Sequence, residues 1–68
     1  MNAVMTIQGD KYVDVCYEHQ RQDGVWLYII DRSDRSFSFV YDTDSKLTPP
    51  ELTEMYTDAF RPRAVFPR

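Results

Sequence analysis

Residues 25–30 decide the fold, and they read Val25-Trp26-Leu27-Tyr28-Ile29-Ile30, six apolar side chains without interruption. The run is too short for a helix of ordinary length, and its β-branched and aromatic residues favour a strand. Because side chains alternate between the two faces of a strand, the odd-numbered and even-numbered residues of the run lie on opposite faces. Both faces are therefore predicted to be apolar, and a single helix cannot cover both.

A hairpin is predicted to precede this run. Its strands are residues 3–8 and 11–18, and the second of them alternates apolar and polar side chains. The Gly-Asp pair at residues 9–10 joins them, since a two-residue loop that begins with glycine is typical of a type II′ turn. This turn places Ile7 opposite Tyr12.

A second hairpin is predicted to follow the run. Residues 36–41 alternate aromatic side chains with smaller ones and form its last strand. Two registers remain open. An odd-numbered turn places Leu27 and Ile29 beside the phenylalanines of the last strand, whereas a four-residue turn shifts the pairing by one and gathers the aromatic residues of both strands on one face.

One helix is predicted after the strands. Thr48 and Glu51 have the spacing of a capping box, and Leu47 and Leu52 have that of a hydrophobic staple. Prolines in the first turn are compatible with a helix start, because the N–H groups there have no helical partner. Apolar residues then recur at spacings of three and four and form one stripe, at Leu52, Met55, Tyr56, Ala59 and Phe60.

These elements predict an α+β domain. The expected fold, within residues 1–60, is a four-stranded antiparallel β-meander followed by one C-terminal α-helix that packs on one face of the sheet (ββββα). Residues 61–68 read Arg-Pro-Arg-Ala-Val-Phe-Pro-Arg and are expected to form a basic tail, partly docked through Val65 and Phe66 or mobile. A chain of 68 residues has no room for a second core.

Composition excludes several classes of protein. The chain has a net charge of −3 and a single cysteine, which cannot form an intrachain disulfide. No apolar run approaches the roughly 18 residues of a membrane-spanning helix. The N-terminus also lacks the basic and then apolar layout of a signal peptide. The sequence therefore predicts a soluble, cytoplasmic protein.

The sequence offers no constellation of catalytic or metal-binding residues. His19 falls in a predicted polar loop, and Cys16 is interpreted as a small buried residue of a strand. Residues 42–46 resemble the start of a calcium loop but lack its central glycine and closing glutamate. One cysteine and one histidine cannot form a tetrahedral zinc site. We therefore expect no enzymatic activity, no cofactor and no metal.

The second apolar face of the sheet is the predicted docking surface. Leaving large apolar side chains in water forgoes about 25 cal/mol for each Å² that could be buried, so the face requires a cover. The sheet itself, a second copy of the chain or a different molecule could provide it. The side chains predicted to contact a partner there are Tyr12, Trp26, Tyr28, Ile30 and Val40.

Acidic loops at one end of the meander are predicted to assist docking. Asp23, Asp42 and Asp44 gather there and would steer the chain toward a basic surface. The expected function is that of a small acidic interaction module, a regulator or inhibitor that docks on another protein or forms a homodimer. Phage-type inhibitors provide an analogy at the level of the class.

The sheet aromatics also suggest an alternative, a module that binds single-stranded RNA or DNA. Aromatic side chains would stack on bases, while Arg61, Arg63 and Arg68 would contact phosphates. The net charge of −3 and the acids that flank each strand disfavour this alternative, because nucleic-acid surfaces require a basic groove.

Overall fold

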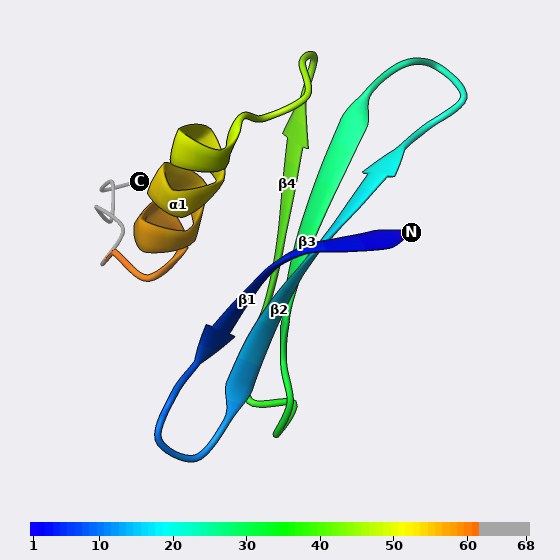
Figure 1. Ribbon diagram of the computed structural model, residues 1–68. Helices are drawn as coiled ribbons and strands as arrows, with labels where there is room; N and C mark the ends of the chain where they lie inside the picture. The colour runs from blue at the N-terminus through cyan, green and yellow to red at the C-terminus, as the bar shows by residue number, and fades with distance from the viewer. Residues whose placement is uncertain (62–68) are drawn as a thin grey trace, which may run out of the picture.

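One antiparallel sheet carries a helix on one of its faces (Figure 1). The computed structural model describes residues 1–61. The sheet order is β1-β2-β3-β4, and the elements are β1 (Asn2–Gln8), β2 (Val13–Gln20), β3 (Trp26–Arg32), β4 (Ser38–Thr43) and α1 (Pro49–Ala59). The predicted ββββα fold is confirmed. The predicted tail lies outside the described residues from position 62 onward, and so does the expected docking of Val65 and Phe66.

The turn between β3 and β4 determines which side chains share a face. Arg32 N donates to Phe37 O at 3.1 Å, so residues 33–36 form a four-residue turn between them. Of the two registers that the sequence left open, this is the one that gathers the aromatic residues. The resulting cross-strand pairs include Tyr28 with Tyr41 and Ile30 with Phe39.

The first hairpin has a register two residues away from the predicted one. Gly9 N donates to Tyr12 O at 2.9 Å, so the loop consists of residues 10–11. The predicted pairing of Ile7 with Tyr12 is wrong, because Ile7 pairs with Asp14. Glycine leaves room for Tyr12 at position 9, since a Cβ there would lie 2.7 Å from Cε1 of the Tyr12 ring and one of the two would have to shift. A shift by two residues keeps the side chains of residues 5–8 on their predicted faces, whereas an irregularity between Ala3 and Met5 makes Ala3 pair with Tyr17.

Helix α1 begins as the capping pattern predicts. Thr48 is the N-cap, with extended backbone, and its N–H donates to Glu51 Oε1 at 2.9 Å. Leu52 N donates to Thr48 O at 2.9 Å and opens the helical ladder. Phe60 is the C-cap. Within residues 1–61, no helix combines the length and the apolarity that are needed to cross a membrane.

A core between the sheet and α1 joins the two layers. Its buried apolar side chains are Cys16, Tyr28, Ile30, Leu52 and Met55. The helical residues among them belong to the predicted apolar stripe, and the two layers therefore share one core.

The helix covers the face of β3 that the sequence analysis left uncovered. Tyr28 and Ile30 are 0% exposed, and Trp26 packs against the core. The expectation that these three side chains lie on an uncovered face is therefore wrong. The four-residue turn is the physical reason: it adds the aromatic rings of β4 to this face and makes it the larger apolar area to bury.

Candidate functional site: an open sheet face and an acidic groove

The five residues predicted to contact a partner through the sheet do not share one surface. Tyr28 and Ile30 are fully buried beneath α1. Tyr12 and Trp26 are partly buried on the same side of the sheet. Val40 lies on the opposite face and is 57% exposed. Of the five, Val40 is the one that is available on the face without a helix.

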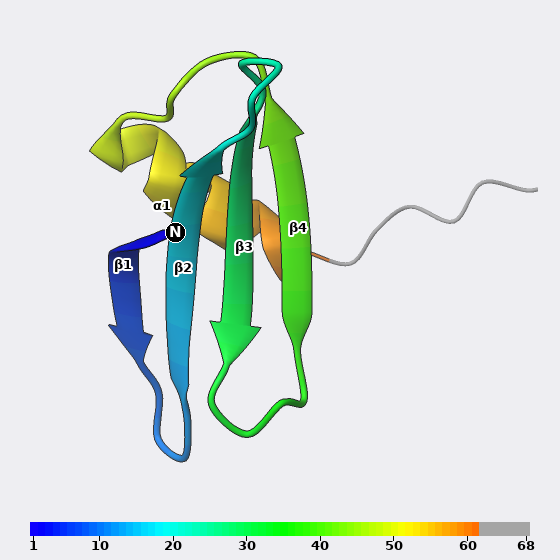
Figure 2. The same ribbon diagram turned by 90° about the vertical axis from the view of Figure 1, so that its right-hand side faces the viewer.

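The face of the sheet opposite α1, which we call the open face, is apolar in its centre. Tyr17, Ile29 and Val40 are paired in a row across β2, β3 and β4. In Figure 2 this face is turned toward the viewer, and α1 lies behind the sheet. The open face consists of the partly or largely exposed side chains of Val13, Val15, Tyr17, Leu27, Ile29 and Val40.

The margin of the open face is polar, and Arg21 adjoins it beside Asp42. The strand registers place six polar side chains around its centre, namely Thr6, Gln8, His19, Asp31, Ser38 and Asp42. Asp31 Oδ1 accepts a hydrogen bond from Ser38 Oγ at 2.9 Å. His19, which was expected in a loop, lies in β2 and is exposed.

The three aspartates predicted to steer docking lie around the β2–β3 hairpin and the end of β4. Asp23 accepts from Val25 N at 3.1 Å and pairs with Arg21. These two contacts, the Val25 bond foremost, hold the pKa of Asp23 below its usual value. Asp42 and Asp44 line one shallow depression together with Arg21. The structure thus places all three aspartates at one end of the sheet.

A buried ion pair that the sequence analysis missed links β2, β3 and α1. Asp14 is 1% exposed, and Arg32 donates to its two oxygens from Nε at 2.8 Å and from Nη2 at 3.0 Å. Tyr56 OH donates to Asp14 Oδ2 at 2.7 Å. The Arg32 hydrogen bonds hold the pKa of Asp14 below its usual range, although burial acts in the opposite direction. Burial raises the pKa of Tyr56 to about 12, so its phenol stays protonated.

Aromatic rings surround the Arg32 guanidinium. Its Cζ lies 3.6 Å from the Tyr12 ring centroid, 5.4 Å from that of Phe37 and 5.3 Å from that of Phe60. Such rings stabilise a cation that has lost part of its water. Tyr12 therefore covers an internal ion pair and does not belong to the open face. The sequence signal was Asp14 itself, because a carboxylate on the core side of a strand needs a cationic partner.

A second buried polar cluster lies where the chain enters α1. Tyr28 OH donates to Glu18 Oε2 at 2.8 Å and accepts from Leu47 N at 2.8 Å. Lys46 Nζ lies 3.9 Å from Glu18 Oε1 and 5.6 Å from the Trp26 ring centroid. Burial raises the pKa of Tyr28 to about 12. This cluster ties the segment before α1 to the sheet.

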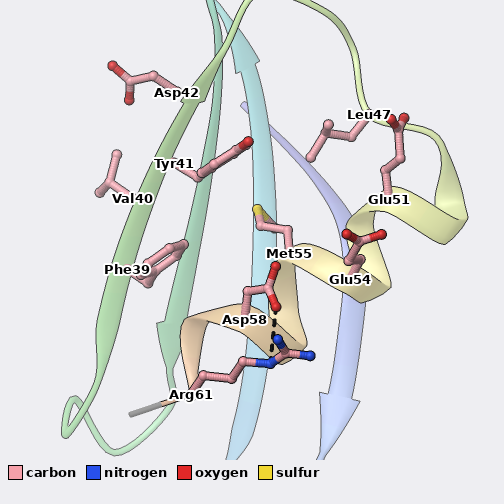
Figure 3. Close-up of a pocket in the computed structure, with 10 residues that line it drawn as sticks. All are labelled: Phe39, Val40, Tyr41, Asp42, Leu47, Glu51, Glu54, Met55, Asp58 and Arg61. Carbon is pink, nitrogen blue, oxygen red and sulfur yellow. Dashed lines mark ion pairs between the residues drawn. The ribbon is translucent and has the colours of Figure 1, made fainter. Parts of the chain in front are cut away.

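A groove of about 620 Å³, which we call the acidic groove, lies between β4 and α1 (Figure 3). In Figure 3, Phe39 and Tyr41 point from β4 toward the helix, whereas Val40 and Asp42 point away from it. The apolar lining on the helix side of the sheet is Phe39, Tyr41, Leu47 and Met55. Its wall on α1 carries Glu51, Glu54 and Asp58.

The reactive residue types offer little chemistry in this fold. Cys16 is 1% exposed, which confirms its interpretation as a small buried residue. Burial, with the nearby charge of Glu18, raises the pKa of its thiol to about 11. In the described part of the chain, no group of three or more His, Cys, Asp or Glu side chains could hold a metal ion.

Comparison with known proteins finds no relative, since no family model, no curated protein and no solved structure matches the chain. The function is therefore inferred from the surfaces of this chain alone.

Proposed function

We propose that this chain is a non-catalytic protein-interaction module that regulates or inhibits a partner protein by docking on it through the open face. The observation that carries the proposal is the apolar centre of this face, which lies on the side of the sheet away from α1. Burial of such side chains against a partner is favourable, since it removes apolar surface from water. An apolar centre within a polar margin is also the usual anatomy of a protein interface.

The acidic loops supply the remainder of the interface. Four strands about 4.8 Å apart and about 20 Å long present a face of roughly 400 Å². A standard interface buries about 800 Å² on each partner, so the sheet alone is too small. Asp23, Asp42 and Asp44 lie at one end of the same sheet and would extend the contact. Their charge favours a partner with a basic surface next to an apolar one.

The open face gives a single-stranded nucleic acid little to bind. Among the described residues, Tyr17 is the one phenylalanine, tyrosine or tryptophan on this face, because the other such rings of the strands lie on the helix side. Arg61 is 71% exposed and pairs with Asp58, away from this face. Arg63 and Arg68 lie outside the described residues. The proposal therefore favours a protein partner.

The test is partner capture with a substitution at the centre of the open face. Tyr17→Lys places a charge there, and a lysine stem can lie along a sheet surface without unfolding it. Thr53→Lys is the matched control, since Thr53 is exposed on α1. We expect the wild type and Thr53→Lys to retain the same protein from a lysate of the native host. Tyr17→Lys, with an unchanged circular dichroism spectrum, should bind that purified protein at least about tenfold more weakly.

Two results would contradict the proposal. Equal affinity of the purified partner for the wild type and Tyr17→Lys would remove the open face from the interface. A wild type that sediments as a dimer, while Tyr17→Lys sediments as a monomer, would assign the open face to a second copy of the chain.

A further inference from the structure

Strand β4 is an edge strand with an open backbone along the acidic groove. Arg32 and Phe37 form a hydrogen-bonded pair, and such pairs alternate with non-bonded ones along an antiparallel ladder. Ser38, Val40 and Asp42 therefore direct their backbone N–H and C=O groups away from β3. No described strand lies beyond β4. An exposed edge of this kind is a template for an added strand.

The groove beside this edge has a negatively charged wall. Glu51, Glu54 and Asp58 line it from α1, and Arg61, the one cation among the described lining residues, lies 3.3 Å from Asp58. The floor between β4 and α1 is aromatic and aliphatic. Arginine and lysine suit such a groove, because their stems cover apolar surface while their charged ends reach carboxylates.

Strand geometry fixes the pattern of the occupant. Alternate residues of an added strand point to opposite faces of the sheet. Those on the α1 side would cross the groove toward Glu54 and its neighbours, and those on the other side would lie next to Val40. We propose that β4 and the acidic groove bind an extended segment of a partner protein, as a fifth strand, in which arginine or lysine alternates with apolar residues.

This inference goes beyond the proposed docking through the open face. It concerns the edge and the helix side of the sheet, and it specifies the chemistry of the bound segment. Tyr17→Lys lies outside the groove and serves as a reference that distinguishes the two surfaces.

A labelled hexapeptide, Arg-Val-Arg-Val-Arg-Val, is the probe, and Glu-Val-Glu-Val-Glu-Val is its control of opposite charge. With the full chain, fluorescence anisotropy should show binding of the first peptide alone, and this binding should weaken as salt rises from about 0.05 to about 0.2 M. Glu54→Lys should weaken binding at least about tenfold. Asp10→Lys makes the same change in net charge at the exposed turn between β1 and β2, which does not line the groove. This variant should leave the affinity within about twofold of the wild type. Equal losses in both variants would overturn the proposal in favour of unspecific attraction.

N-methylation of the probe tests whether the backbone of β4 takes part. Two forms of the arginine–valine hexapeptide are compared. One carries N-methyl groups on the backbone amides of its odd-numbered residues, and the other carries them on those of its even-numbered residues. In a paired strand the N–H groups of only one set face β4. One peptide should therefore lose binding at least about tenfold while the other keeps it, whereas equal binding of both would overturn strand addition.

The chain's own C-terminal segment is the competing occupant, because its sequence also combines arginines with apolar residues. A double variant, Arg63→Gln with Arg68→Gln, distinguishes the two. Unchanged peptide affinity in this variant is the expected result. Peptide binding that appears only in this variant would overturn the proposal, since the segment of the same chain would then fill the groove.

Discussion

Asp14 is a fully buried carboxylate that the fold tolerates because each of its oxygens is satisfied. Arg32 donates to both oxygens, and Tyr56 donates a further hydrogen bond from α1. Taking a charge out of water costs several kcal/mol unless a partner with good geometry compensates it. A single side chain of β2 thus fixes the positions of β3 and the last part of the helix.

Replacing Asp14 by Asn should destabilise the protein strongly. The substitution keeps the shape of the side chain but leaves Arg32, whose side chain is 16% exposed, without its counter-ion. We expect the free energy of unfolding at pH 7, measured with urea, to fall by about 3 kcal/mol. Asp10→Asn removes the same charge from an exposed turn and should change the stability by less than about 0.5 kcal/mol. Similar effects of the two substitutions would contradict this role of Asp14.

The contribution of Asp14 should also depend on pH. Its pKa is lowered in the folded protein from an ordinary value of 3.8, chiefly by the hydrogen bonds from Arg32. The stabilisation is therefore fully present above pH 3.8, and it is lost as the pH falls through the lower pKa of the folded protein. Stability curves of the wild type and Asp14→Asn should converge in this acidic range and stay apart at neutral pH.

At the scale of the elements, the sequence was sufficient for the order and type of each strand and for the helix. Period-two alternation and the Thr48–Glu51 cap are local signals, and each appears in the structure within a few residues of its predicted place. The register of the first hairpin was less predictable. Gly9 lies next to the two-residue turn and gives room to the Tyr12 ring. Residue preferences of turns do not describe such a side-chain contact, so they placed the turn one residue too early.

The choice of the covered face could not be predicted, because it depends on the length of one turn. If the turn between β3 and β4 were one residue longer or shorter, Tyr28 and Ile30 would no longer lie beside the aromatic rings of β4. The two polar clusters were missed for a related reason, since Asp14 and Arg32 are 18 positions apart and meet only through the register of β2 and β3. Of the residues predicted to contact a protein partner, Val40 and the three aspartates Asp23, Asp42 and Asp44 are the ones that the structure leaves largely exposed.

Tyr28 should hold α1 in place at its N-terminal side. Its hydroxyl joins Glu18 of β2 to the amide of Leu47, which precedes the helix. Tyr28→Phe leaves both groups without this partner inside the protein. We expect a loss of about 1–3 kcal/mol in the free energy of unfolding. Tyr17→Phe removes a hydroxyl from the open face and should be almost neutral, whereas equal losses in the two variants would contradict the importance of the Tyr28 bonds.

At the scale of the whole molecule, neither layer has a core of its own. Cys16, Tyr28 and Ile30 of the sheet are buried only together with Leu52 and Met55 of the helix. A chain of 68 residues buries a small fraction of its surface compared with larger domains, so it cannot afford to lose this contact. The two polar clusters connect the sheet to the helical layer at two places, one at Leu47 just before α1 and one at Tyr56 within it.

The sheet and the helix should therefore unfold in one cooperative transition. Three probes report on different places: far-ultraviolet circular dichroism on both layers, fluorescence on Trp26, and reaction with a chromogenic disulfide reagent on Cys16. Because Cys16 is 1% exposed and burial raises the pKa of its thiol to about 11, the reagent should react only with opened molecules. In urea all three probes should give the same midpoint, with a dependence of the unfolding free energy of about 1 kcal/mol per molar. A Trp26 transition at a clearly lower urea concentration than the other two would show that the segment entering α1 separates from the sheet first, and the layers would then not form one unit.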